Sequence, residues 1–235
     1  MRDANQALTW NERFVANDGM DKYVDIAIEA QEVYSHLWQD SEIVLAMKFL
    51  DENLDSKENG FIEVGSAMGG SFHCWASIIP NGPKISVDLP FYSSGDYAPY
   101  MVEATVHSNI SGYVDKRNAM WSERFSNVTS VVGSSMDEEN IKKVDDILDG
   151  HKCDFLFIDG NHSLEFIKSD FENYSKHVRS GGFVGFHDIS FPGHDVGIFW
   201  DGLVSKFPEL CTPLITVPWS SRDGYICSIG MLRII

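Results

Sequence analysis

A short apolar segment that opens directly into glycines is the feature that most constrains the fold of this chain. The segment near Phe61–Gly65 reads F-I-E-V-G, continues as S-A-M-G-G and then enters the helix-compatible run Ser71–Ile79. Glycines allow a positive φ and let a ligand approach bare backbone, while the first amides of a helix point at whatever lies above them. The stretch therefore predicts a strand, a tight turn and a helix that form one wall of a ligand site.

The spacing of these glycines argues against a nicotinamide or flavin site, because Ala67 stands where a dinucleotide fingerprint has its second glycine. A second acid favours a nucleoside ligand instead. The segment Lys84–Asp88 is a short apolar strand that ends in a carboxylate, 23 residues after Gly65. An acid at about this distance accepts hydrogen bonds from ribose hydroxyls in nucleotide-binding βαβ units. The alternative is that Asp88 only caps the following loop.

Length and composition are those of one enzyme-sized domain spanning residues 1–235. Of its 235 residues, 43% are apolar and 12% aromatic, which is enough to bury a core. The net charge of −17 repels phosphates and argues against nucleic acids and anionic membranes as partners. The four cysteines form no CxxC pair, and the sequence shows neither a signal peptide nor an apolar run near 18 residues. We therefore expect a cytoplasmic protein, and a homo-oligomer stays open.

Strand and helix patterns alternate along the chain, which predicts an α/β fold with a doubly wound, mostly parallel sheet. An N-terminal helical segment is expected within residues 1–55. The expected strands are 61–65, 85–88, 128–132, 153–159, 183–187, 214–217 and 225–234, and the expected helices between them are 71–79, 141–148, 164–178 and 196–207. The last two strands are separated by a turn only, so one of them must be antiparallel. Residues 90–126 fit neither pattern and are interpreted as a lid or an insertion.

Acids and histidines follow two of the expected strands. Asp159 and His162 come at the end of the run F-L-F-I, and His187 and Asp188 end the run F-V-G-F. Because neighbouring parallel strands end at the same edge of a sheet, we expect these side chains to converge there.

Taken together, E-V-G-S-x-x-G-G-S, I-D-G-x-H-S and G-G-F-V-x-F-H-D resemble the motifs of class I S-adenosylmethionine-dependent methyltransferases. Within that class they are similar to small metal-dependent O-methyltransferases, the cephalosporin hydroxylase-like and macrocin or macrolide-sugar O-methyltransferase group. The resemblance extends from about Ser41 to Ile235 and is weakest in the segment 90–127. It implies a Rossmann-like seven-stranded sheet in the order 3-2-1-4-5-7-6.

The resemblance also implies roles for individual residues. S-adenosylmethionine would be bound by Glu63, Gly65, Ser66, Gly69, Gly70, Ser71, Asp88, Gly133, Ser134, Ser135 and Asp159. A divalent metal, Mg or Mn, would be held by Asp159, His187 and Asp188, and His162 would be the general base. Ser134 and His187 depart from the family pattern. Imidazole prefers manganese, iron or zinc, so either the metal is softer than magnesium or only the two aspartates bind it.

The implied function is methyl transfer to a hydroxyl of a small molecule of the sugar or glycosylated natural-product type. Two alternatives stay open, an oxidoreductase on the same fold and a noncatalytic S-adenosylmethionine-binding module. At the level of residues, Asp188 could instead cap a turn, and His162 could cap the helix that follows it. Asp137 is interpreted as a helix N-cap, and His194 as a surface or satisfied histidine.

Overall fold

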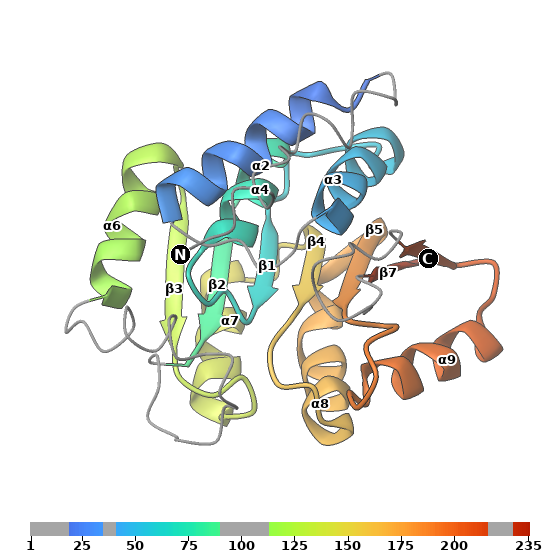
Figure 1. The fold of residues 1–235 in the computed structure, drawn as a ribbon. Helices are drawn as coiled ribbons and strands as arrows, with labels where there is room; N and C mark the ends of the chain where they lie inside the picture. Colours follow the sequence, from blue (N-terminus) through green and yellow to red (C-terminus); the bar gives the residue numbers. More distant parts are fainter. Residues whose placement is uncertain (1–18, 35–40, 90–112, 216–227) are drawn as a thin grey trace.

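The computed structural model describes residues 19–34, 41–89, 113–215 and 228–235. They form a three-layer sandwich, with helices on both faces of one seven-stranded sheet (Figure 1). The strands are β1 (Phe61–Val64), β2 (Lys84–Asp88), β3 (Val128–Val132), β4 (Cys153–Ile158), β5 (Val178–His187), β6 (Cys211–Ile215) and β7 (Ser228–Arg233). Their order is β3-β2-β1-β4-β5-β7-β6; β1 to β5 are parallel, and β7 is antiparallel to both neighbours. The predicted fold class and strand order are confirmed.

The helices divide into two groups. One face of the sheet is covered by α2 (Asp21–Tyr34), α3 (Ser41–Asn53), α4 (Gly70–Ile78) and α6 (Tyr113–Arg124). The other is covered by α7 (Glu138–Leu148), α8 (Leu164–Tyr174) and α9 (Val196–Lys206). The central strands are apolar on both sides because both sides are buried. In β4, for example, Phe155 and Phe157 pack toward α4 while Leu156 and Ile158 pack toward α7 and α8.

One predicted boundary is wrong. The helix after β4 does not continue to Val178, because α8 ends at Tyr174, a single 3-10 turn follows, and Val178 already begins β5. Gly182 therefore lies inside a strand rather than after a helix. A Cβ on Gly182 would lie 2.6 Å from the carbonyl oxygen of Asp154, at the point where the β4–β5 register shifts. The glycine accommodates an irregular strand pairing.

The segment 90–126, interpreted as a lid or an insertion, is described only in its last part. There residues 113–124 form α6, which buries Arg117 and Trp121 under the glycine turn. The remainder of the lid, residues 90–112, lies outside the described residues, as do residues 1–18 and the turn predicted at 220–224.

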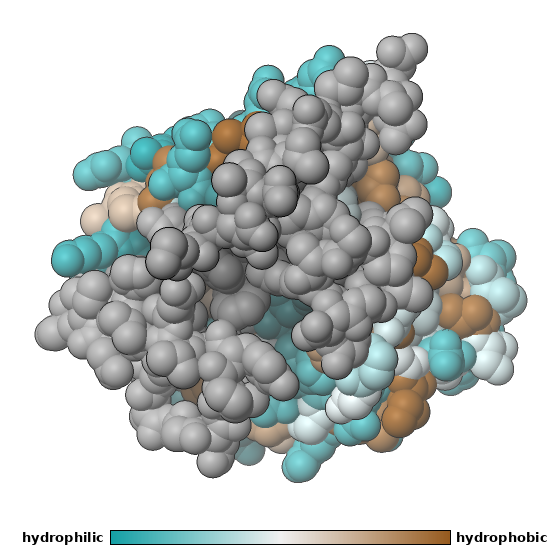
Figure 2. All heavy atoms as spheres, viewed as in Figure 1, coloured by the Kyte–Doolittle hydropathy of each residue, from teal (hydrophilic) through white to brown (hydrophobic). Residues whose placement is uncertain are grey.

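The surface among the described residues is mixed. In Figure 2 hydrophobic residues are scattered among hydrophilic ones on the coloured part of the surface, and the exposed large hydrophobic side chains include Ile198 on α9. Such a mixture is usual for a globular protein. None of the described helices combines the length and the apolar character that crossing a membrane requires.

Candidate functional site

The predicted site residues gather at the carboxyl edge of the sheet, around the ends of β1, β2, β4 and β5. Gly65 joins the two predicted clusters. Its φ is +87°, and a Cβ at this position would lie 2.1 Å from the carbonyl oxygen of Asp159. The glycine turn after β1 is therefore in backbone contact with the acid at the end of β4, which only glycine permits.

The turn itself leads into α4 as predicted. Gly69 is the N-cap with φ +97°, and Gly70 and Ser71 are the first helical residues. A Cβ on Gly69 would lie 2.8 Å from the ring of Trp121, whose Nε1 donates to the Gly69 carbonyl at 3.3 Å. α6 thus packs against the N-terminus of α4 through Trp121.

Glu63 lies beneath this turn and is fully buried. The Nε1 of Trp75 on α4 donates a hydrogen bond to Oε1 of Glu63 at 3.1 Å. Burial raises the pKa of Glu63 to about 8, although the nearby hydroxyls of Ser66 and Ser71 oppose the rise. A carboxyl with this pKa can donate or accept a hydrogen bond near neutral pH.

Asp88 ends β2 as predicted, but it has a partner that the sequence did not reveal. Nη1 of Arg117 on α6 donates to Asp88 Oδ2 at 2.8 Å and to the Ala67 carbonyl at 2.6 Å, and the guanidinium lies 4.5 Å from the centre of the Trp121 ring. Burial raises the pKa of Asp88, and Arg117 opposes this rise. Arg117 therefore ties the acid to the glycine turn. A carboxylate accepts about four hydrogen bonds, so Asp88 keeps capacity for a ligand.

The turn after β3 lies beside Asp88, since the amide of Gly133 donates to the Asp88 carbonyl at 2.8 Å. The Ser134 hydroxyl accepts from the amide of Met136 at 3.2 Å, and Tyr174 donates to the Ser135 carbonyl at 2.8 Å. The position of Asp137 as N-cap of α7 is confirmed, but its side chain makes no capping hydrogen bond.

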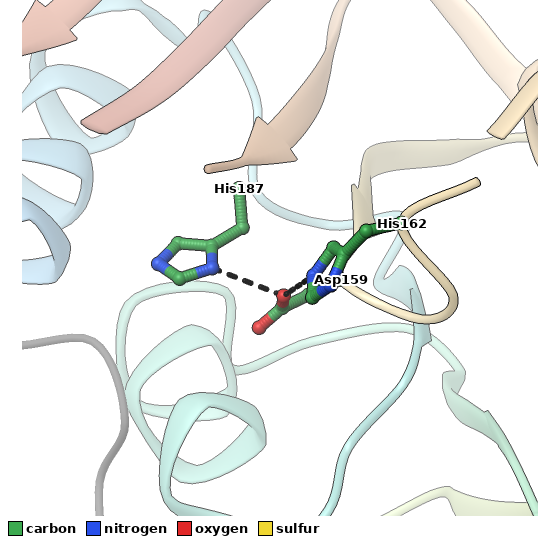
Figure 3. Close-up of side chains that lie close together, drawn as sticks. All are labelled: Asp159, His162 and His187. Carbon is green, nitrogen blue, oxygen red and sulfur yellow. Dashed lines mark ion pairs between the residues drawn. The ribbon is translucent and has the colours of Figure 1, made fainter. Parts of the chain in front are cut away.

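The acid–histidine cluster forms where β4 and β5 end (Figure 3). Nδ1 of His187 lies 3.0 Å from Oδ1 of Asp159, and Nε2 of His162 lies 3.6 Å from the same oxygen. Burial alone would raise the pKa of Asp159, but the two histidines outweigh it and lower the pKa to about 2. Burial would lower the pKa of His187, but the charges of Asp159 and Asp188 hold it well above its ordinary value. The carboxylates around this histidine thus favour its protonated form.

Asp188 extends the cluster to the far side of His162. Its Oδ1 lies 3.4 Å from His187 Nδ1, and its Oδ2 lies 3.6 Å from His162 Nε2 and 3.2 Å from His194 Nδ1. Asp188 has a φ of 59°, a left-handed backbone conformation that is uncommon for residues other than glycine, although aspartate adopts it more often than most. Such outliers cluster at functional sites.

The donor set fits a divalent transition metal. Two ligand atoms that each lie about 2.1 Å from one ion are roughly 3.0–3.5 Å apart, which matches the two His187–aspartate distances. Two groups can place one ligand atom each within 4.8 Å of the others: Asp159, His162 and His187, and His162, Asp188 and His194. Among the described residues, the predicted set of Asp159, His187 and Asp188 is not one of these groups. The second trio is unsuitable for one ion. The rings of His162 and His194 stack at 4.0 Å with an interplanar angle of 11°, and an ion cannot lie in both ring planes.

The structure also shows the surroundings of His162, His194 and Glu42. His162 does not cap α8, because Ser163 is the N-cap and the first helical amide, of Leu164, donates to Oδ2 of Asp195 at 3.0 Å. His194, interpreted as a surface or satisfied histidine, has partners, since it stacks on His162 and its Nδ1 lies 3.2 Å from Asp188 Oδ2. Glu42 of α3 was not identified from the sequence. This residue is fully buried, and its Oε1 lies 3.3 Å from Nε2 of His187.

Comparisons with known proteins place this geometry in context. The profile of a family described as "Methyltransferase domain" matches residues 62–189. An uncharacterized protein of Acanthamoeba polyphaga mimivirus is 30% identical over 128 residues, 54% of this chain and 50% of that protein. The matched stretch thus spans about half the length of this curated relative.

Several solved structures share the fold. A Staphylococcus aureus protein assigned as a caffeoyl-CoA O-methyltransferase superposes with a TM-score of 0.55 at 16% identity, covering 98% of this chain and 100% of its own. An rRNA methylase from Streptococcus thermophilus gives 0.54 at 9% identity, covering 85% and 100%. An O-methyltransferase from Bacillus cereus in complex with SAH gives 0.54 at 14% identity, covering 89% and 90%.

Proposed function

The chain belongs to this methyltransferase domain family, and we propose that it transfers the methyl group of S-adenosylmethionine to a hydroxyl oxygen of a small molecule. The observation that carries the proposal is the backbone contact between Gly65 and Asp159. It joins the turn expected to bind the cofactor to the cluster expected to bind the acceptor, so a donor and an acceptor held by the two would be neighbours.

The residues that would hold S-adenosylmethionine lie along one edge. Glu63, Gly65, Ser66, Gly69, Gly70 and Ser71 would bind the amino-acid end, Asp88 the ribose, Gly133, Ser134 and Ser135 the adenine side, and Asp159 the end nearest the acceptor. When bound, the sulfonium supplies an activated methyl group. The protein then binds and orients the cofactor and the acceptor, and it excludes water from the site.

A divalent metal would be held by Asp159, Asp188 and His187. Such an ion supplies a Lewis acid that lowers the pKa of an acceptor hydroxyl. One imidazole among the ligands favours manganese, iron or zinc over magnesium. His162 would take the acceptor proton, since its Nε2 lies 3.6 Å from an oxygen of each aspartate and its side chain is 28% exposed. It is thus both oriented by carboxylates and open to an incoming molecule.

The net charge of the chain favours a small-molecule acceptor over RNA. The same fold occurs in an rRNA methylase, so the fold alone does not choose the acceptor. The net charge of −17 opposes the approach of RNA. A hydroxylated small molecule of the sugar or glycosylated natural-product type avoids that repulsion and agrees with the O-methyltransferase structures that share the fold.

Calorimetry with S-adenosylhomocysteine and with NAD⁺ tests the cofactor. We expect binding of S-adenosylhomocysteine only; binding of NAD⁺ alone would favour an oxidoreductase.

Methyl transfer from labelled S-adenosylmethionine to a panel of sugars and glycosides then tests the reaction, with and without a chelator. Cofactor binding without any transfer would favour a noncatalytic module. Full transfer after chelation would show that the reaction needs no metal.

A further inference from the structure

Glu42 and His187 form a buried pair that the proposed function does not use. Glu42 lies at the start of α3, 145 residues before His187, and its exposed fraction is 0%. Its Oε1 lies 3.3 Å from Nε2 of His187, while its Oε2 makes no hydrogen bond with the described residues. Burying a carboxylate costs free energy unless it is paired and hydrogen-bonded. The contact with His187 is therefore the interaction that bears on a function of Glu42.

The two nitrogens of His187 face different partners. Nε2 faces Glu42, whereas Nδ1 faces Oδ1 of Asp159 at 3.0 Å and Oδ1 of Asp188 at 3.4 Å. In the neutral imidazole one nitrogen carries hydrogen and the other carries a lone pair. A hydrogen on Nε2, donated to Glu42, leaves the lone pair of Nδ1 directed at the two aspartates. Figure 3 shows one ring nitrogen of His187 turned toward Asp159 and the other turned away from it.

We propose that His187 binds the metal through Nδ1 and that Glu42 is the positioning residue that fixes this tautomer. The inference rests on the metal site of the proposed function and names the nitrogen through which His187 would bind, against the alternative that only the two aspartates bind the metal. Histidines that bind metals almost always donate their other ring N–H to a carboxylate, a carbonyl or water, and loss of that partner costs 10- to 100-fold in metal affinity or activity. Here a helix outside the matched segment 62–189 supplies the carboxylate.

Titration of Mn²⁺ into metal-free full-length protein, followed by calorimetry, tests the pair. We expect Glu42→Leu to weaken Mn²⁺ binding by about 10- to 100-fold. Glu42→Gln keeps an oxygen that accepts the Nε2 hydrogen, so its affinity should stay within about tenfold of wild type. Glu52→Leu, at an exposed position of the same helix, is the matched control and should leave the affinity unchanged. Binding of S-adenosylhomocysteine by each variant checks that it is folded.

The outcomes separate this inference from the proposed function. If wild type binds Mn²⁺ and Glu42→Leu binds it equally well, Glu42 is only a structural partner and the inference is overturned while the metal stands. If wild type binds S-adenosylhomocysteine but no Mn²⁺, both the metal and this inference fail, while the cofactor site of the proposed function is supported.

A spectroscopic measurement addresses the tautomer directly. In Zn²⁺-loaded protein with ¹⁵N-labelled histidine, NMR should show hydrogen on Nε2 of His187 and none on Nδ1. The His187→Gln variant identifies the signal by its loss. Hydrogen on Nδ1 of His187, with Nε2 bound to the metal instead, contradicts the assigned geometry.

Discussion

At the scale of single residues, the pair of Asp88 and Arg117 changes how the cofactor site must be tested. Removing the carboxylate with Asp88→Ala would leave the buried guanidinium without its partner, a change that costs roughly 3–5 kcal/mol in buried pairs. Arg117 has an exposed fraction of 1%, so water cannot replace the lost carboxylate easily. A loss of binding in that variant would therefore mix unfolding with cofactor recognition.

Asp88→Asn is the cleaner change, because an amide oxygen still accepts from Arg117 while the charge is lost. Each lost charge-assisted hydrogen bond to ribose is worth about 1.5–3 kcal/mol, so affinity for S-adenosylhomocysteine should fall at least about tenfold. Calorimetry measures this directly, with Asp115→Asn on α6 as the control. Unchanged affinity would remove Asp88 from the cofactor site.

His162 carries the prediction about proton transfer. If it takes the acceptor proton, His162→Ala should lose roughly 10²–10⁴-fold in kcat, at the low end of that range if a metal already acidifies the hydroxyl. Affinity for S-adenosylhomocysteine should change little. The control is His151→Ala, a histidine whose Nδ1 lies 2.8 Å from the carbonyl oxygen of Leu148 at the end of α7. A variant with a lower melting temperature and normal kcat would show that His162 is structural.

At the scale of elements, the contact between the ends of β1 and β4 holds the two halves of the site together. Gly65→Ala should push these ends apart, because the added Cβ would lie 2.1 Å from the carbonyl oxygen of Asp159. Affinity for both S-adenosylhomocysteine and Mn²⁺ should then fall in one variant. Backbone strain alone would not do this, since alanine in the left-handed region costs only about 1–2 kcal/mol.

Gly150→Ala provides the matched comparison for that prediction. Gly150 has nearly the same φ, +81°, but an added Cβ would meet nothing within 4 Å. It should lose stability by about the strain alone and keep both ligands. If the two variants behave alike in calorimetry and in thermal unfolding, the close approach of β1 and β4 does not organise the site.

At the scale of the whole molecule, the parts of the fold that sequence predicts are those set by local patterns. Strand and helix periodicity predicted the sheet, and the rule that parallel strands end at one edge predicted that Asp159, His187 and Asp188 lie together. The missed boundary at Val178 has a physical reason, since glycines after a helix and glycines in an irregular strand look the same in sequence.

The missed residues come from elements whose approach depends on tertiary packing. Glu42 and Arg117 reach the site from α3 and α6, far from the motifs in sequence. One signal for Glu42 existed. It lies four residues before Ala46 and eight before Leu50, both fully buried, so a charged residue stands on the core-facing stripe of a helix. Nothing comparable marks His194, whose stacking on His162 depends on the path of the chain after β5.

Global stability should depend on pH through Asp170, a fully buried carboxyl on α8. Burial raises its pKa from 3.8 to about 6, although Ser135 opposes the rise. A group whose pKa is raised in the folded state stabilises the protein fully below its unfolded pKa, and this contribution is lost as the pH rises through the folded pKa. Asp170 therefore contributes its stabilisation below about pH 4 and loses it by about pH 6.

Asp170→Asn removes this titration, so its stability relative to wild type should increase as the pH rises from 5 to 7.5. Each kcal/mol gained raises the melting temperature by about 2–4 °C in a chain of this size. Thermal unfolding of both proteins across this range gives the difference. Glu172→Gln, on the same helix, should leave the difference from wild type constant. A constant difference for Asp170→Asn as well would mean that Asp170 titrates in the folded protein as it does in the unfolded chain.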